Sequence, residues 1–173
     1  MSKENIVNLI LNDYDSFVEY HRANPEIELS EADFSNAELD SADFSNIDFS
    51  GASFVDANLT NINFTDCDLS TTDFSRANIV ECNFSNCLLA GANFSYSSVN
   101  YCDFNDADMA GANFSETDLT DSDLSTSENL DSVRFDDSTI WPADEKLPEG
   151  FDCTYNADLS SLQDEDDTSA DSY

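Results

Sequence analysis

Large apolar residues recur at every fifth position over most of the chain. Stepping by five from Leu29, 20 successive positions as far as Leu124 carry Leu, Phe, Ile, Val or Met. After an insertion of one residue, the pattern resumes at Leu130, Phe135 and Ile140. A period of five fits neither the turn of an α-helix nor the two-residue alternation of a flat strand. The chain is therefore predicted to turn a corner every five residues, with these large residues, the centres, facing inward.

Residue types around the centres repeat best at 20 residues, which indicates four sides per coil. Two residues before each of the first 20 centres stands a small or β-branched residue, such as Ala32 or Thr72, so a large and a small side chain share the interior. Asp, Asn, Ser and Thr lie between and after them, where they face water and form turns. Phenylalanine dominates two columns of centres, which are Phe34, Phe54, Phe74, Phe94 and Phe114, and Phe44, Phe64, Phe84 and Phe104.

The motif A(D/N)(L/F)xx, as in Ala32-Asp33-Phe34-Ser35-Asn36, resembles the repeat of the pentapeptide-repeat family over about two thirds of the chain. The resemblance implies an all-β solenoid, a right-handed parallel quadrilateral β-helix of about six coils, in which hydrogen bonds between coils support the core. The quinolone-resistance and gyrase-inhibitor members of this family are DNA-mimicking rods that occupy the DNA site of type II topoisomerases. They are typically dimers joined through their C-terminal ends, and many other members have no assigned activity.

An N-terminal helical cap is expected over residues 1–25, with a helix from Asn5 to Arg22 that Pro25 stops. Such a helix would cover the open edge of the first coil. Two alternative apolar faces have helical spacing, namely Ile6, Ile10, Tyr14, Phe17 and Val18, or Leu9, Leu11 and Tyr20.

The β-helix is expected over residues 26–141 and an exit segment over 142–153, where Trp141 and Phe151 would cover the last coil. Residues 154–173 are polar and acidic and are expected to be a disordered tail.

The charge balance restricts the partners. The chain has 38 Asp and Glu against 5 Lys and Arg, a formal net charge of −33. Such a surface repels nucleic acid and anionic lipid and attracts basic proteins. No apolar run is long enough to cross a membrane, and the N-terminal residues lack the features of a secretory signal. We therefore expect a cytoplasmic protein that binds neither nucleic acid nor membrane and whose partner is basic.

Most of the acid lies in the repeats, where residues 26–141 hold 24 acidic and 2 basic residues. Six coils at ~4.8 Å would span roughly 29 Å, a length of duplex DNA that carries about 17 phosphate charges. The rod thus matches DNA in linear charge density. The predicted DNA-mimicking surface consists of the acids just before the centres, namely Glu28, Asp33, Asp43, Asp48, Asp68, Asp73, Asp103, Asp108, Asp118 and Asp123.

A neutral belt interrupts this charge, because no charged residue occurs from Cys82 to Cys102. The belt includes Leu88, Tyr96 and Tyr101 at outward positions. One hypothesis is an interface for a partner or a homodimer. Tolerated variation is the alternative.

Catalytic chemistry finds little support. Four cysteines, Cys67, Cys82, Cys87 and Cys102, occupy the inward small position and are interpreted as core residues with free thiols. The only histidine is His21, and neither a phosphate-binding loop nor a zinc-ligand spacing occurs. We expect no enzyme activity, metal site or cofactor.

The leading hypothesis is a non-catalytic DNA mimic that inhibits or shields a DNA-binding enzyme, either a type II topoisomerase such as gyrase or a restriction or other defence nuclease. The alternative is a scaffolding solenoid whose acidity serves solubility or reflects a salt-rich host.

Overall fold

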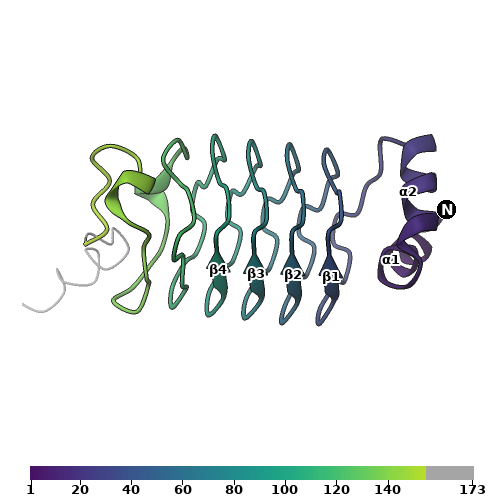
Figure 1. Cartoon of the computed structure of the whole chain (residues 1–173), viewed down its shortest axis with the longest axis horizontal. Helices are drawn as coiled ribbons and strands as arrows, with labels where there is room; N and C mark the ends of the chain where they lie inside the picture. The colour runs from purple at the N-terminus through teal and green to yellow at the C-terminus, as the bar shows by residue number, and fades with distance from the viewer. Residues whose placement is uncertain (155–173) are drawn as a thin grey trace, which may run out of the picture.

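The computed structural model describes residues 1–154, which form a rod of stacked square coils with two helices at its N-terminal end (Figure 1). The coils belong to one right-handed parallel quadrilateral β-helix, as the resemblance implied, and the chain turns a corner every five residues, as the period predicted. The expected tail, 154–173, lies outside the described residues except for its first residue.

One side of the coil carries the regular strands. β1 (Glu38–Asp40), β2 (Asn58–Thr60), β3 (Asn78–Val80) and β4 (Ser98–Asn100) form a parallel sheet in the order β1-β2-β3-β4. Each residue pairs with the one 20 positions later, so that Leu39 lies beside Leu59. We call this the strand side.

The other three sides pair by single parallel bridges with the same offset over most of their length, as in Asp48 with Asp68. We name them by their first centre: the Leu29 side, the Phe34 side and the Phe44 side. Because opposite sides of a coil are ten residues apart, the Leu29 side lies opposite the strand side.

The core consists of the centres and the small residues two positions before them. Phe84 is fully buried and stacks between Phe64 and Phe104, with ring centroids 5.1 and 4.9 Å apart. It also meets Phe74 edge-on at 5.9 Å. Two ladders of rings therefore run along the rod and contact each other at right angles, a geometry that aromatic pairs favour. Phe34, Phe44, Phe54, Phe64, Phe74, Phe84, Phe94, Phe104 and Phe114 are at most 1% exposed.

The four buried cysteines share this interior as free thiols. Cys67 Sγ donates to the backbone oxygen of Phe44 at 3.0 Å, and Cys87 Sγ donates to that of Phe64 at 2.9 Å. Burial raises the pKa of Cys67 to about 12 and also raises that of Cys87.

The corners lie two residues after each centre. From Glu31 to Asp121, every fifth residue has a positive φ, in the left-handed region. Asn and Asp are common at this position because they tolerate that conformation. This single feature turns the chain from one side to the next.

The N-terminal cap is two helices instead of the single one expected. α1 (Lys3–Asn12) and α2 (Tyr14–Ala23) are separated at Asp13, whose side chain accepts a hydrogen bond from the Ser16 N–H and so caps α2. The cap packs on the coils through Ile6, Ile10 and Phe17, the first of the two apolar faces that the sequence allowed.

The C-terminal end departs from the expected pattern. Ile140 is 53% exposed, so it is not the inward centre that the resumed period predicted. It pairs with Asp118, which faces outward, and the neighbouring Trp141 turns inward to Phe114 and Phe135, with ring centroids 6.1 and 5.3 Å away. The pairing offset grows from 21 residues between Asn113 and Arg134 to 22 between Asp118 and Ile140. One extra residue therefore lies between Phe135 and this pairing, and it moves Ile140 to the outward position before the centre.

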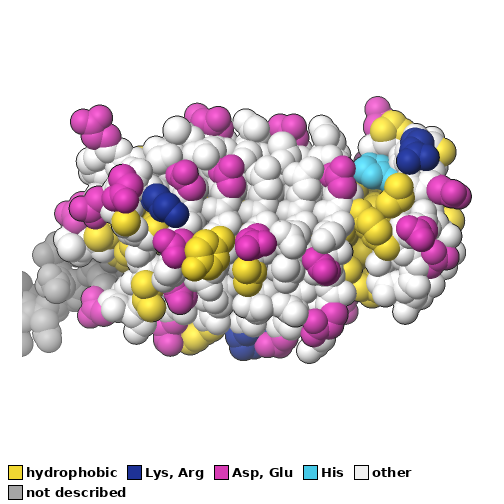
Figure 2. Space-filling model, in the orientation of Figure 1, with side chains coloured by type: hydrophobic (Ala, Val, Ile, Leu, Met, Phe, Trp, Pro, Cys, Tyr) yellow, Lys and Arg dark blue, Asp and Glu magenta, His cyan; other side chains and the backbone are white. Residues whose placement is uncertain are grey.

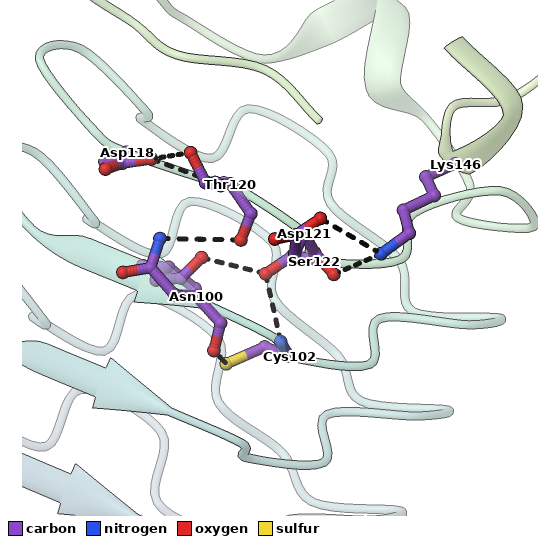
Figure 3. Close-up of polar contacts among 8 residues, drawn as sticks. Asn100, Cys102, Asp118, Thr120, Asp121, Ser122 and Lys146 are labelled. Carbon is purple, nitrogen blue, oxygen red and sulfur yellow. Dashed lines mark hydrogen bonds and ion pairs between the residues drawn. The ribbon is translucent and has the colours of Figure 1, made fainter. Parts of the chain in front are cut away.

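Two short 3-10 helices, η1 (Leu130–Ser132) and η2 (Asp144–Lys146), complete this end. Phe151 closes on Trp141 at 5.0 Å. Lys146 Nζ donates to the backbone oxygen of Asp121 at 2.5 Å, which fixes η2 to the last coil (Figure 3).

Candidate functional site

The outward carboxylates before the centres are held by the backbone. Asp68 Oδ1 accepts the N–H of Ser70 at 2.9 Å, and Asp48 Oδ1 accepts that of Ser50 at 2.8 Å. One carboxylate oxygen thus completes the backbone hydrogen bonding of the turn, while the charge stays at the surface. The position therefore favours Asp for two reasons, its turn chemistry and its charge.

This hydrogen bond keeps the carboxylates ionised. The Ser35 N–H bonded to Asp33 lowers the pKa of that carboxyl, and the Ser125 N–H does the same for Asp123. Hydrogen bonds to the charged form of an acid stabilise that form. Both groups are therefore anionic at neutral pH.

The structure aligns the longest run of carboxylates on the Leu29 side. Parallel bridges connect Glu28 to Asp48, Asp48 to Asp68, and Asp108 to Glu128, with Leu88 between Asp68 and Asp108. Neighbouring coils lie ~4.8 Å apart. This column is the densest array of charge on the β-helix.

The ten predicted acids do not lie on one surface. The Phe44 side carries a second column with asparagines between its acids, and single acids are found elsewhere. The Leu29 side holds Glu28, Asp48, Asp68 and Asp108, the Phe44 side holds Asp43, Asp103 and Asp123, the Phe34 side holds Asp33 and Asp73, and the strand side holds Asp118.

Sequence reasoning missed the acids at the corners and at the end of the column. Asp66 and Asp106 occupy the corner between the Phe44 and Leu29 sides and join the two columns. A step of five from Glu31, which lists every corner, would have found them. The missed residues are Glu31, Asp56, Asp66, Glu81, Asp106, Glu116 and Asp121 at corners, Glu128 at the end of the column, and Glu38 before the centre Leu39.

Little of this charge is neutralised. Within residues 1–154 the ion pairs are Arg76 with Asp56 at 2.8 Å and Lys146 with Asp121 at 3.9 Å. Acidic side chains are spread along the rod with few Lys or Arg between them (Figure 2). The Leu29 and Phe44 sides can therefore attract a basic surface.

The three residues of the neutral belt do not form one patch. Leu88 is 49% exposed and lies on the Leu29 side, whereas Tyr96 and Tyr101 are each 60% exposed and occupy the two corners of the strand side. Leu88 also lacks the oxygen with which Asp68 accepts a turn N–H. The tyrosines thus share one surface and Leu88 belongs to the opposite one.

No group of three or more His, Cys, Asp or Glu among residues 1–154 is arranged to hold a metal ion. In the same part of the chain, no helix has the length and apolar character needed to cross a bilayer.

Stacked square coils with an apolar interior and polar sides define a quadrilateral β-helix built from five-residue repeats. Residues 57–140 match the family described as pentapeptide repeat region, and residues 27–66 match pentapeptide repeats in eight copies. The chain belongs to the pentapeptide-repeat family. No curated protein sequence matches it.

Solved structures of this kind are similar to the chain. The pentapeptide repeat protein Rfr23 from the cyanobacterium Cyanothece 51142 is 22% identical, with 71% of this chain and 96% of that one covered and a TM-score of 0.43. A pentapeptide repeat protein from the Arabidopsis thaliana thylakoid lumen is 32% identical over 52% of this chain and 59% of that one, with a TM-score of 0.33. QnrB1, a plasmid-mediated fluoroquinolone resistance protein, is 23% identical over 64% and 68%, with a TM-score of 0.33.

Proposed function

We propose that this protein is a non-catalytic DNA mimic that binds the basic DNA site of another protein and inhibits or shields it. The observation that carries the proposal is the column of carboxylates on the Leu29 side, from Glu28 to Glu128, joined to the Phe44 side by Asp66 and Asp106. A DNA-binding site that is complementary to phosphates is also complementary to such an array.

The targets that suit this chemistry are a type II topoisomerase and a restriction or other defence nuclease, both of which act on duplex DNA in the cytoplasm. Binding needs no cofactor. It should weaken steeply with salt, because the contacts are between exposed charges.

The test uses the full chain and variants that remove charge but keep the turn. In the triple variant Asp48→Asn, Asp68→Asn and Asp108→Asn, each amide oxygen can still accept the turn N–H, as Asn83 Oδ1 does from Ser85 at 2.8 Å. The change removes three charges from one side of the rod and leaves the backbone hydrogen bonds in place. The matched control is Asp33→Asn with Asp73→Asn, on the Phe34 side.

The assay measures inhibition of DNA supercoiling by gyrase and of DNA cleavage by type II restriction endonucleases, with added duplex DNA as competitor. We expect the wild-type chain to inhibit, and added duplex DNA or about 0.5 M salt to relieve the inhibition. The triple variant should inhibit about tenfold or more weakly, whereas the control variant should inhibit nearly as well as the wild type. Failure of the wild-type chain to inhibit any of these enzymes would count against those targets. Unchanged inhibition by the triple variant would exclude the Leu29 side as the surface that binds the enzyme.

A scaffolding function is the second candidate. It is favoured by the strand side, where the outward residues of β2, β3 and β4 are uncharged. A scaffold of this kind would bind a partner that is indifferent to added DNA.

A further inference from the structure

The strand side holds the longest uncharged stretch along the rod, three successive coils from β2 to β4. Glu38 and Asp40 lie at its N-terminal end, and Asp118 lies beyond β4. Between these acids, the outward side chains of the strands in three coils are all neutral. They are Asn58, Thr60, Asn78, Val80, Ser98 and Asn100.

Each of the three asparagine amides on this side donates a hydrogen bond within the protein, and Asn58 Nδ2 donates to Glu38 Oε2 at 2.9 Å. Asn78 Nδ2 donates to Asn58 Oδ1 at 2.7 Å, and Ser98 Oγ donates to Asn100 Oδ1 at 2.6 Å. Asn100 Nδ2 donates to the backbone oxygen of Thr120 at 3.4 Å (Figure 3). The amide N–H groups of this surface are therefore already partnered, and covering the surface costs less than covering free charges.

Two tyrosines border this side in the same coil as β4. Tyr96 and Tyr101 have φ values of 62° and 57°, and each side chain is 60% exposed. Bulky residues are unfavourable in the left-handed region, and here no burial compensates for that conformation. Thr71 and Arg76 share this corner conformation, so it is the exposure of the two aromatic rings that points to contact with another molecule.

The charges at these corners are partly cancelled. Arg76 makes two hydrogen bonds to Asp56, at 2.8 and 2.9 Å, which leaves Glu81 as the unpaired corner charge over the three central coils. The negative charge of Glu116 raises the pKa of Tyr96, so that phenol stays neutral.

We propose that the strand side, with Tyr96 and Tyr101 at its edges, is a self-association surface that binds a second copy of this chain. The charge distribution favours this occupant: two rods of net charge −33 repel each other through every acidic side, and a basic partner is drawn to those acidic sides instead. This inference is independent of DNA mimicry, which uses the opposite side.

Two-fold symmetry fits the placement of the tyrosines. In an isologous dimer each contact occurs twice. A two-fold axis parallel to the rod exchanges the two corners of the strand side without changing the height along the rod. It therefore brings Tyr96 of each copy against Tyr101 of the other.

The contact should be weak. Three coils at ~4.8 Å give a neutral surface only about 14 Å long. The area of such a surface is smaller than the roughly 800 Å² per partner that a stable interface buries. Repulsion between the remaining charges opposes association and is screened by salt. The dimer should therefore form more readily as salt is added, opposite to a contact between acid and base.

Sedimentation equilibrium of the full chain, up to about 1 mM protein and at low and about 0.5 M salt, tests this proposal. We expect a monomer–dimer equilibrium that salt strengthens. The double variant Tyr96→Asn and Tyr101→Asn should weaken the dimer at least tenfold, whereas Leu88→Asn, on the opposite side, should leave it unchanged. Asn suits these corners because Asn61 and Asn86 already adopt the same φ.

Circular dichroism of each variant confirms that the fold is retained. A chain that stays monomeric under all these conditions would overturn the proposal. So would a dimer that the tyrosine variant does not weaken, that Leu88→Asn disrupts, or that salt dissociates.

Discussion

Replacing Asp68 separates its structural role from its charge. Asp68 Oδ1 accepts the partly buried N–H of Ser70 at 2.9 Å. The variant Asp68→Ala removes this acceptor, and a hydrogen bond of this kind contributes about 0.5–1.5 kcal/mol. Because water can reach part of the freed N–H, we expect a loss of about 1 kcal/mol in the free energy of unfolding, or a fall of about 2–4 °C in Tm.

Asp68→Asn keeps the acceptor and removes the charge. Asn63 shows that the amide suffices, since its Oδ1 accepts the Thr65 N–H at 3.1 Å. The variant also removes repulsion with Asp48, one coil away. Its stability should therefore equal or slightly exceed that of the wild type.

Urea denaturation followed by far-UV circular dichroism measures both variants, and proteins of this repetitive kind need a check that unfolding is a single transition. The reasoning would be refuted by equal losses in the two variants, which would assign the effect to charge or to packing. It would also be refuted by no loss in Asp68→Ala.

Two further predictions concern the core. Phe84→Ala should destabilise the protein by about 3–5 kcal/mol, because the ring stacks on both Phe64 and Phe104. Phe84→Leu is the milder control. Equal falls in the urea midpoint for the two variants would contradict the stacking argument. A thiol reagent at mildly alkaline pH should modify exposed Cys153 in the native protein and reach the four buried cysteines only after unfolding; rapid labelling of more than one thiol per native chain would show that the core opens.

The five-residue period was enough to predict the coils and the interior. Each centre from Leu29 to Leu124 is buried, because one large inward residue per side repeats regardless of what the neighbouring polar residues are. The same regularity explains why the side of each outward residue could be assigned from its number alone.

Irregular segments were harder to predict. The break between α1 and α2 depends on one local hydrogen bond at Asp13, and helical spacing continues on both sides of it. At the other end, either Ile140 or Trp141 could take one inward position. Trp141 occupies it, and its ring contacts Phe114, Phe135 and Phe151. Periodicity carries no information about either choice.

The acidic surface was predicted in composition but only partly in arrangement. Most acids before the centres were identified, although Glu38 was not. The corner acids such as Asp66 and Asp106 were missed because the prediction followed the inward positions and did not consider the left-handed corner positions. Leu88 and the two tyrosines are close in sequence yet lie on opposite sides, because ten residues along a coil is half a circuit.

The 20-residue offset between neighbouring coils also limits how the gene for such a rod can change in length. Loss or duplication of 20 residues, as between Asp48 and Asp68, leaves every later residue on its original side and only shortens or lengthens the column. Loss of a single repeat of five would rotate everything beyond it by a quarter circuit. The carboxylates of the Leu29 side would then end at the deletion and continue around the corner. Rods of this type can therefore be tuned to a longer or shorter partner in whole coils, while smaller insertions and deletions are tolerated mainly at the ends.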